Sequence, residues 1–532
     1  MISIGIEFST QSVKTVALDL KSGEMVFSDT FEYDTVFPEY ETMGGILPSE
    51  LPEERHTSPL MLVEAMDHCF KRLSSSMDLS LVRVIKVDAM QHCTVYVKAG
   101  FRDRLSSLNY QYSLVDQLTD IFSRSTCPTW EDRSTADEAK YLAGALDYMG
   151  GMSRLTGNRA ELRFPAAQIL RWAKTNPVQY DQTERIILLS AFMTSILAGK
   201  EVSVDTGDGW GTNLNNLDIN NPGWHPHVVE IVDTRIAAFG AVTPLLEKLG
   251  VMDHYDTPAG PISPYFAEKY GLDPSTEILT GTGDNPATLL GCGGSITVSL
   301  GSSYTLNGVM RDIEPSLEGE YNIFGYTRGQ SMALSVITNG AKVHDNFMRA
   351  YLRVPKDRKP GAREWALYTS YAGELELKPD EPLLLPYLMD ESVPQNKKGI
   401  HRDRLHHDDA KGNIRALHLS QVLSMKLHSS HLGAVDQLCI VGGGAKNKVM
   451  RQWIADTFNA VTYSIKHADL AAPMGCSVSG AAHVLSLSYE KAIQGFVKRD
   501  ETTICRPEKK NNAIINQLQH RYLLLENSVV SG

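Results

Sequence analysis

A short stretch near the middle of the chain carries an acidic residue in a glycine-rich loop. The loop reads Gly281-Thr282-Gly283-Asp284-Asn285-Pro286 and leads into a predicted helix. Pro286 fits the first helical turn, where its missing N–H is no loss. An Asp at such a place is also an ordinary helix N-cap. Taken alone, the loop is explained equally well by capping and by catalysis.

A second feature follows within a few residues. Ile296–Leu300 is predicted to be a strand, and it runs into the turn Gly301-Ser302-Ser303. Such a turn offers N–H groups and hydroxyls to an anion, often a phosphate, although a plain hairpin turn is the commoner explanation. A carboxylate beside a phosphate cradle is what a phosphotransferase needs to orient a substrate hydroxyl. The two features become informative if a second cradle occurs elsewhere.

The N-terminus supplies that second cradle. Residues 2–8 alternate as a strand, Ser9-Thr10-Gln11-Ser12 form a turn, and residues 13–18 return as another strand. Glu7 lies just before the turn. Because residues 297–308 repeat this pattern, the sequence predicts an internally repeated architecture. Two such hairpins could hold the phosphates of one nucleotide, with Mg²⁺ between them.

Three further residues are candidates for sugar binding. His92 follows a predicted strand, residues 81–90, and ligands bind at the carboxyl ends of strands in open sheets. A core histidine that bonds to the backbone is the competing explanation. Trp130 lies in an acidic loop, residues 127–133, where its ring could face the apolar side of a sugar or simply pack. Arg163 interrupts a helical region and could point into a cleft, although surface arginines are commoner.

A run of three glycines occurs near the end of the chain. The predicted strand Gln437–Val441 ends in Gly442-Gly443-Gly444, and a helix is predicted over Lys448–Phe458. The run lacks the spacing of a dinucleotide-binding or P-loop motif. A plain strand-to-helix turn rarely needs three glycines, so the run favours close contact with a nucleotide.

Composition narrows the class of protein. A chain of 532 residues predicts about two or three domains, and 42% apolar with 21% charged residues is typical of a soluble globular protein. The net charge of −12 disfavours nonspecific binding to nucleic acid. We expect no signal peptide and no membrane span. Seven scattered cysteines without a C-x-x-C motif indicate a reducing, cytoplasmic location and no disulfide framework.

The remaining segments of the chain are described by their composition and coarse periodicity. Residues 136–200 are predicted to be mostly helical, and the proline-rich segment 240–265 is the expected crossover between the halves. The histidine- and aspartate-rich run 401–409 is interpreted as a solvated loop rather than a metal site. The last thirty or so residues are predicted to be peripheral.

In combination, these motifs resemble the FGGY carbohydrate kinases, most closely the xylulokinases of the eukaryotic type. The resemblance covers about residues 4–485, and no single stretch would establish it. The matching stretches read G-I-E-F-S-T-Q-S-V-K, M-Q-H-C-T-V-Y, C-P-T-W-E-D-R-S-T, L-T-G-N-R-A-E-L-R-F, T-G-D-N-P-A-T-L-L-G, V-S-L-G-S-S and G-G-G-A-K-N.

The resemblance implies an α/β fold of two ribonuclease-H-like domains, as in actin and hexokinase, around an interdomain cleft. We place the first domain at residues 1–254, with sugar binding and the first phosphate clamp. The second domain, residues 255–532, would hold the catalytic base, the second clamp and the adenosine loop. The implied site residues are Asp284 as the base, His92, Arg163, Asn285 and Trp130 at the sugar, Ser9, Thr10, Gly301, Ser302 and Ser303 at the phosphates, Gly442, Gly443, Asn447 and Trp365 at adenosine, and Glu7 at Mg²⁺.

The implied activity is transfer of phosphate from ATP to a sugar, D-xylulose before any other. Four positions depart from the family's usual residues: Glu7 stands for Asp, Cys93 for Gly, and His418-Leu419 for Glu-Gly. The alternatives are a kinase for ribulose, fuculose, gluconate or glycerol, a sugar-sensing pseudokinase, and an ATP hydrolase. The sequence is compatible with a homodimer but does not set the oligomeric state.

Overall fold

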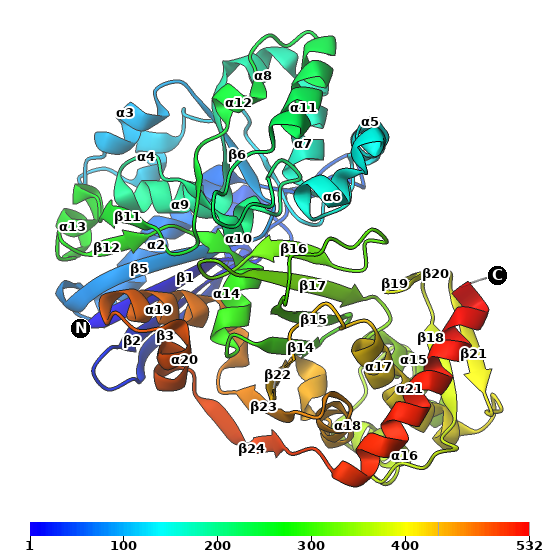
Figure 1. Ribbon diagram of the computed structural model, residues 1–532. Helices are drawn as coiled ribbons and strands as arrows, with labels where there is room; N and C mark the ends of the chain where they lie inside the picture. The colour runs from blue at the N-terminus through cyan, green and yellow to red at the C-terminus, as the bar shows by residue number, and fades with distance from the viewer. Residues whose placement is uncertain (435, 531–532) are drawn as a thin grey trace. The chain divides into compact units, whose positions relative to one another are not determined.

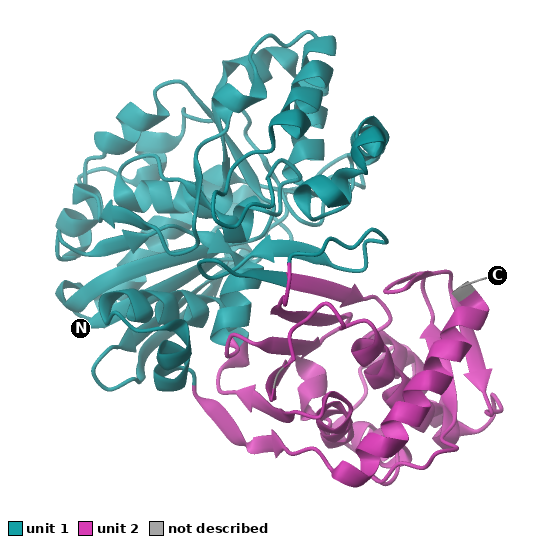
Figure 2. Ribbon diagram, viewed as in Figure 1, with its two compact units in different colours: residues 1–291, 313–332, 469–497 teal, residues 292–312, 333–468, 498–532 magenta. Residues whose placement is uncertain are grey.

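The computed structural model describes residues 1–434 and 436–530, and the chain divides into two compact units (Figure 2). Unit 1 comprises residues 1–291, 313–332 and 469–497, and unit 2 comprises residues 292–312, 333–468 and 498–532. This division differs from the predicted one at residue 254. Residues 255–291 belong to unit 1 because β12 (Glu277–Leu279) and β13 (Thr282–Gly283) pair with β5 (Val82–Ala89).

Unit 1 is built on a sheet of strand order β11-β12-β5-β1-β2-β3. The strands β1, β2 and β3 pair antiparallel, whereas β1 with β5 and β5 with β12 pair parallel. All of β1 is buried, as expected for a strand covered on both faces. The remaining bounds are β1 Ile2–Phe8, β2 Ser12–Asp19, β3 Met25–Glu32 and β11 Pro258–Pro261.

Helices from distant parts of the chain pack on this sheet (Figure 1). The helix α19 (Ala471–Val484) contacts β1, β2 and β5, and α9 (Leu189–Ala198) contacts β5 and β12. The helix α14 (Asp284–Gly291) packs along α19, with Ala287 and Cys476 in one buried cluster. Other helices of unit 1 are α2 Pro59–Ser76, α4 Leu114–Leu118, α13 Pro264–Tyr270 and α20 Tyr489–Phe496.

A separate apolar core in unit 1 forms around a strand pair and three helices. The strand β6 (Thr94–Lys98) pairs with β8 (Thr183–Leu188). The prediction that residues 136–200 are mostly helical is confirmed, with β8 as the exception, because Ile186 and Ile187 pair with β6 and fit a buried strand. The helices are α5 Ala136–Ala145, α7 Pro165–Thr175 and α11 Pro226–Ala238.

Unit 2 contains a sheet with a similar arrangement, in the order β17-β15-β14-β22-β23-β24. As in β2-β1-β5, an antiparallel hairpin, β15-β14, is followed by a parallel strand, β22. The repeat seen in the sequence and the two ribonuclease-H-like domains are thereby confirmed. The bounds are β14 Ile296–Leu300, β15 Tyr304–Val309, β17 Ser331–Ile337, β22 Gln437–Val441, β23 Val461–Ile465 and β24 Arg499–Cys505.

The C-terminal segment is part of the core of unit 2. The helix α21 (Lys509–Val530) packs on α17 and α18 and buries Leu518 and Tyr522. The prediction of a peripheral tail is wrong, because an amphipathic helix at the chain end covers apolar surface of unit 2. The other helices are α15 Ala341–Leu352, α16 Ala362–Tyr371, α17 Ala410–Leu427 and α18 Lys448–Phe458.

Two simple expectations about the chain can be compared with the fold. All seven cysteines are free thiols, in line with the expectation that no disulfide framework exists. Among the helices of the described residues, none combines the length and the apolar character needed to cross a membrane.

Candidate active site

Asp284 is the first residue of α14 and directly follows the two-residue strand β13. The side chain retains some exposure but is surrounded by protein. This burial, reinforced by the negative charge of Glu7, raises the pKa of the Asp284 carboxyl to about 7, while the N–H groups of Gln91 and Asn285 oppose the shift. A carboxyl that titrates near neutral pH is suited to general base catalysis.

Gln91 connects Asp284 to the rest of the site, and the sequence analysis did not single it out. Its Nε2 donates to the carbonyl of Gly207 at 2.9 Å and to Oδ1 of Asp208 at 3.2 Å. Its Oε1 accepts from Nδ2 of Asn285 at 3.4 Å, and the same Nδ2 lies 3.0 Å from Oδ1 of Asp284. The amide of Gln91 therefore orients Asn285 beside the acid. Its position next to His92 is the signal that could have drawn attention to it.

His92 adopts a backbone conformation that is uncommon for its residue type. Its φ is 71°, in the left-handed region, and such strain often occurs at functional sites. Its ring stacks on Phe164 at 4.2 Å, and Nδ1 lies 2.7 Å from the carbonyl of Gly211. Burial, together with the charge of Arg163, holds the pKa of His92 well below its usual range. The ring is neutral, and because a carbonyl only accepts, Nδ1 carries the proton and Nε2 presents a lone pair.

Arg163 lies close to His92 through Phe164. Its Nη2 donates to Oδ1 of Asn322 at 3.3 Å, and its guanidinium lies 5.8 Å from the Phe164 ring. Burial lowers the pKa of Arg163, and no carboxylate of the described residues forms an ion pair with it. Arg163 and Trp130 line one pocket of about 620 Å³, which we call the sugar-side pocket. Arginine and an aromatic ring are suitable contacts for sugar hydroxyls and the apolar sugar face.

The N-terminal hairpin forms a tight, hydrogen-bonded tip. The Oγ of Ser9 donates to the carbonyl of Ser12 at 2.7 Å, and the N–H of Ser12 donates to Ser9 Oγ at 3.2 Å. Next to it, Oγ1 of Thr10 accepts from Nε1 of Trp130 at 3.0 Å. The structure thus brings a residue of the predicted phosphate clamp into contact with a residue of the predicted sugar site.

Three ionisable residues surround the base of this hairpin. Glu7 on β1 pairs in register with Asp88 on β5, and its Oε2 lies 2.9 Å from Nζ of Lys14 on β2. Burial raises the pKa of Glu7, with Lys14 opposing the shift. The pKa of Asp88 is raised well above its ordinary value by burial and by the charges of Glu7 and Asp284, and its Oδ1 has no hydrogen-bond partner. A group of carboxyls with an unpartnered oxygen suits a divalent cation.

In unit 2, the hairpin tip at residues 301–303 lies against the start of α15. The N–H of Ala341 donates to the carbonyl of Gly301 at 3.1 Å, and Oγ of Ser303 lies 3.4 Å from the carbonyl of Thr338. The hydroxyl of Ser302, between these two residues, has no hydrogen-bond partner among the described residues.

The glycine run has a structural reason that the sequence did not show. A Cβ on Gly442 would lie 3.0 Å from the backbone of Leu300, and one on Gly444 would lie 2.7 Å from the Leu300 side chain. Gly442 also has a φ of 85°. Only Gly443 has open space where its side chain would be. Gly442 and Gly444 therefore let the loop pack on the strand before the second hairpin tip, whereas a side chain at position 443 would point into open space.

Asn447 and Trp365 are joined by a chain of buried rings in unit 2. Asn447 caps α18 through Oδ1, and its Nδ2 lies 2.9 Å from Nε2 of His418. The ring of His418 lies 5.5 Å from Tyr368, which in turn contacts Trp365 at 5.9 Å. Trp365 itself remains 40% exposed, so its face is available to a flat ligand. The departure at His418 therefore sits directly behind the predicted adenosine loop.

The substitution Gln91→Leu is expected to raise the KM for sugar by about tenfold, the cost of one misplaced polar contact. Leucine has a similar volume but cannot hold Asn285 or bond to Asp208. The KM for ATP should change less than twofold. Steady-state kinetics with either substrate varied would check this. An unchanged sugar KM would contradict the orienting role of Gln91.

A possible metal cluster occurs in unit 2. The ligand atoms of His406, His407 and Asp408 lie within 4.8 Å of one another, and all three residues are exposed, as expected for a solvated loop. The prediction of a loop is wrong for residues 401–403, because they belong to β21 (Gly399–Asp403), which pairs with β18 (Leu383–Tyr387).

The chain was compared with known proteins. It is 32% identical over 547 aligned residues to the xylulose kinase of Rattus norvegicus, covering 99% of this chain and 97% of that protein. It is 28% identical to xylulose kinase 2 of Arabidopsis thaliana, over 90% of this chain and 86% of the relative. The solved structure of the xylulose kinase of Rhodospirillum rubrum superposes with a TM-score of 0.78 at 14% identity, over 100% of this chain and 99% of that one. No model of a protein family matches the chain.

The fold is that of a two-domain carbohydrate kinase. The identity of 32% to a xylulose kinase, over almost the whole of both chains, then narrows the class of carbohydrate kinase. The chain belongs to the xylulose kinases of the FGGY carbohydrate kinase family, and the resemblance seen in the sequence is confirmed.

Proposed function

We propose that this kinase transfers the γ-phosphoryl group of ATP to the C5 hydroxyl of D-xylulose, giving D-xylulose 5-phosphate. The observation that carries the proposal is Asp284, a carboxyl with a pKa of about 7 at the start of a helix. Asp284 lies beside Asn285, which in turn bonds to Gln91. The chain that carries it aligns over almost its whole length with xylulose kinases. The family is shown by these relatives, and the sugar is the proposed part.

In this proposal, Asp284 accepts the proton of the attacking hydroxyl late in the transfer. His92 accepts a hydrogen bond from a sugar hydroxyl through Nε2, and Arg163 and Asn285 donate to the others. Trp130 packs on the sugar and, through Thr10, ties it to the first clamp. Phosphoryl transfer has a loose transition state, so the contribution of these residues is to position and to neutralise charge.

The phosphates are proposed to be held by Ser9, Thr10, Gly301, Ser302 and Ser303. The adenosine is proposed to lie against Trp365, with Gly442, Gly443 and Asn447 at its loop. The open space at Gly443 and the exposed face of Trp365 support these assignments.

Mg²⁺ fits beside the first clamp. Glu7, with Asp88 nearby, would hold it, directly or through water, because the buried carboxyls repel one another and one oxygen is unpartnered. When bound, Mg²⁺ supplies positive charge to the phosphate oxygens. Lys14 contacts Glu7 now and would lie beside the phosphates. We place the reaction in the cytoplasm, where ATP is available as the substrate and a reducing medium would keep the cysteines as free thiols.

The position of transfer can be tested with two substrate analogues. The enzyme should phosphorylate 1-deoxy-D-xylulose and should leave 5-deoxy-D-xylulose unreacted, because only the second lacks the attacking hydroxyl. Product analysis by phosphorus NMR distinguishes the two outcomes. Phosphorylation of the 5-deoxy sugar would overturn the assignment of C5.

The substitution His418→Leu is expected to raise the KM for ATP by about tenfold and to leave the KM for sugar within twofold. Leucine removes the acceptor that holds Nδ2 of Asn447, while Oδ1 can still cap α18. His418→Gln, which retains an acceptor, is the matched control. Equal changes in the two KM values would count against a role limited to the nucleotide.

A further inference from the structure

A second pocket in unit 1 lies next to the sugar-side pocket but shares no lining residue with it. It measures about 610 Å³, a size that suits a small metabolite. Its lining includes Tyr40, Glu54, His56, Arg124, Arg171 and Trp172. Along the extended segment 53–56, alternate side chains line the two pockets: Glu53 and Arg55 the sugar-side pocket, Glu54 and His56 this one.

Arg124 is the unusual residue of this pocket. It is 7% exposed, and its guanidinium lies 5.0 Å from the ring of Tyr96 and 4.8 Å from that of Trp172. Its Nη1 is buried and has no hydrogen-bond partner. In the described part of the chain, no carboxylate is in ion-pair range of Arg124. By contrast, the neighbouring Arg171 already pairs with Glu54 at 3.2 Å.

His56 cannot act as a hydrogen-bond acceptor for the Arg124 guanidinium. Its Nε2 lies 3.3 Å from Nη2 of Arg124 but also 3.2 Å from Oδ2 of Asp132. Although burial opposes it, hydrogen bonds, first among them that of His56, hold the pKa of Asp132 well below its usual range. A carboxylate only accepts, so Nε2 must carry a proton to bond to it. The same nitrogen therefore cannot accept a hydrogen bond from Nη2 of Arg124.

We propose that this pocket binds a small anion that carries a phosphate group, with Arg124 as its main contact, and that His56 and Asp132 link it to the sugar-side pocket. A buried guanidinium without a counter-charge is costly, and an anion from solution removes that cost. The planar fork of arginine matches two oxygens of a phosphate. The apolar ring of Trp172 and the hydroxyl of Thr126 would face the rest of the ligand.

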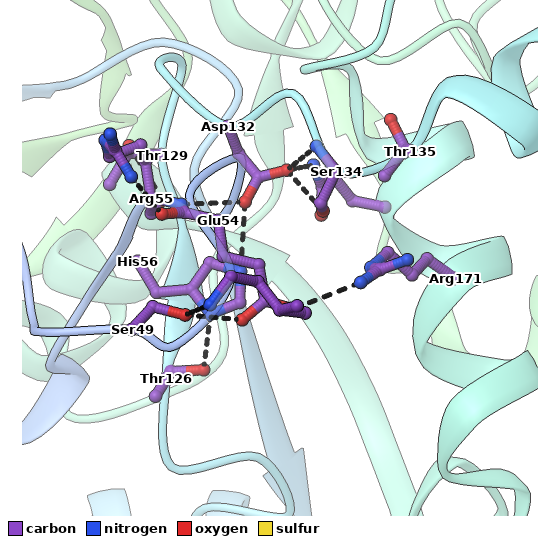
Figure 3. A network of polar contacts seen from close by, with 12 residues as sticks. Ser49, Glu54, Arg55, His56, Thr126, Thr129, Asp132, Ser134, Thr135 and Arg171 are labelled. Carbon is purple, nitrogen blue, oxygen red and sulfur yellow. Dashed lines mark hydrogen bonds and ion pairs between the residues drawn. The ribbon is translucent and has the colours of Figure 1, made fainter.

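The link between the pockets runs through a buried carboxylate, that of Asp132. Figure 3 shows Asp132 bonded to His56, to the N–H of Arg55 and to Ser134, and His56 bonded to Thr126. Asp132 lines the sugar-side pocket two residues after Trp130. A phosphate beside Arg124 would also attract the protonated edge of His56 and weaken its bond to Asp132. The loop that carries Trp130 would then change its preferred position. The effect on sugar binding rests on the proposed function, because Trp130 is a proposed sugar contact.

The binding site can be tested without any assay of activity. Isothermal titration with inorganic phosphate, against chloride at equal ionic strength, should show a saturable site in the unaltered protein. Arg124→Gln should weaken that site at least tenfold. Arg163→Gln, which removes a partly buried arginine of unit 1, and Ser302→Ala, which alters a proposed phosphate clamp, should both retain it. Equal phosphate binding by the unaltered protein and Arg124→Gln, or no saturable binding at all, would overturn the proposal.

Two additions keep this test decisive. If Arg124→Gln does not fold, as judged by its thermal unfolding, Arg124→Lys replaces it. Lysine keeps the charge but loses the fork, and should bind phosphate more weakly than arginine does; equal binding would overturn the role of the fork. A parallel titration with D-ribose 5-phosphate separates the sources of the phosphate group. Tighter binding of the sugar phosphate would assign the pocket to phosphorylated sugars, and tighter binding of the inorganic ion would assign it to free phosphate.

The link needs a kinetic readout. Saturating phosphate should change the KM for sugar at least twofold in the unaltered enzyme and leave it unchanged in His56→Leu. An identical change in both proteins would contradict the link while leaving the binding site intact. If no sugar were phosphorylated, the titration would still decide whether the pocket binds phosphate, so the two proposals can fail separately.

Discussion

Replacement of Asp284 by Asn is expected to lower kcat by about 10²–10⁴-fold, or about 3–5 kcal/mol, while sugar affinity changes only a few fold. Asparagine keeps the size and hydrogen-bonding edge of the side chain but cannot accept the hydroxyl proton. Stopped-flow or steady-state turnover measures the first quantity, and calorimetric titration of the sugar measures the second. Full activity in Asp284→Asn would show that another group serves as the base.

The pH dependence of the unaltered enzyme follows from the same residue. The base acts when it is deprotonated, and burial with the charge of Glu7 raises its pKa to about 7. We therefore expect kcat/KM to fall about tenfold per unit as pH decreases below about 7. The residual activity of Asp284→Asn should not show this acid limb, that is, the fall in kcat/KM below about pH 7. A limb that persists unchanged in the variant would belong to a different group.

The same variant should be more stable than the unaltered protein at high pH. The pKa of Asp284 is higher in the folded protein than in an unfolded chain, where it is about 3.9. Protonation thus favours the folded state, and this stability is present in full below about pH 3.9 and is lost as pH rises from there to about 7. Asparagine has no charge to bury, so the Tm advantage of Asp284→Asn should be clearly larger at pH 8 than at pH 5. Differential scanning calorimetry at both values measures this without any substrate.

Replacement of Gly475 by Val is expected to abolish activity by displacing the helix that begins with Asp284. The helices α14 and α19 approach so closely that a Cβ on Gly475 would lie 1.9 Å from the carbonyl oxygen of Ala287. A Cβ on Gly291 would lie equally close to the carbonyl oxygen of Ala471. No flexible side chain can move aside, because the obstructing atoms are backbone. Overpacking of this kind costs at least about 1–3 kcal/mol, and we expect more here.

Thermal unfolding and kcat of Gly475→Val measure the two consequences. Gly144→Ala, in the helix α5, is the matched control, because nothing lies within 4 Å of its added Cβ. That variant should be as active as the unaltered enzyme and slightly more stable, by about 0.4–1 kcal/mol. If Gly475→Val kept both its Tm and its kcat, the close contact of α14 with α19 would not be what positions Asp284.

The parts of the fold that are set by local patterns could be predicted from the sequence. The bounds of β14, β22 and α18 agree with the expected ones, because apolar periodicity and the Gly and Asn turns delimit them. β8 was missed because its apolar run suits a helix or a strand equally, and only pairing with β6 decides. The extent of unit 1 was missed for a similar reason, since β12 and β13 join it by pairing with a strand nearly 200 positions earlier.

The candidate site shows the same limit. Residue types and a family resemblance pointed to Asp284, His92 and Arg163, and the fold brings these three into one region through Phe164 and Gln91. Gln91, Lys14 and Asp88 could not be ranked in advance, because their roles depend on which strands are neighbours. Two of the three glycines after β22 pack on Leu300, which is a contact that no local pattern reveals.

The most direct test of the account is a coupled assay of ADP release from Mg-ATP against a panel of ketoses and polyols. The panel would contain D-xylulose, ribulose, fuculose, gluconate and glycerol, with a control lacking any sugar. The account predicts ADP release that depends on D-xylulose, with a kcat/KM at least tenfold above that for any other compound. Preference for another compound, or release that needs no sugar, would contradict the proposed function.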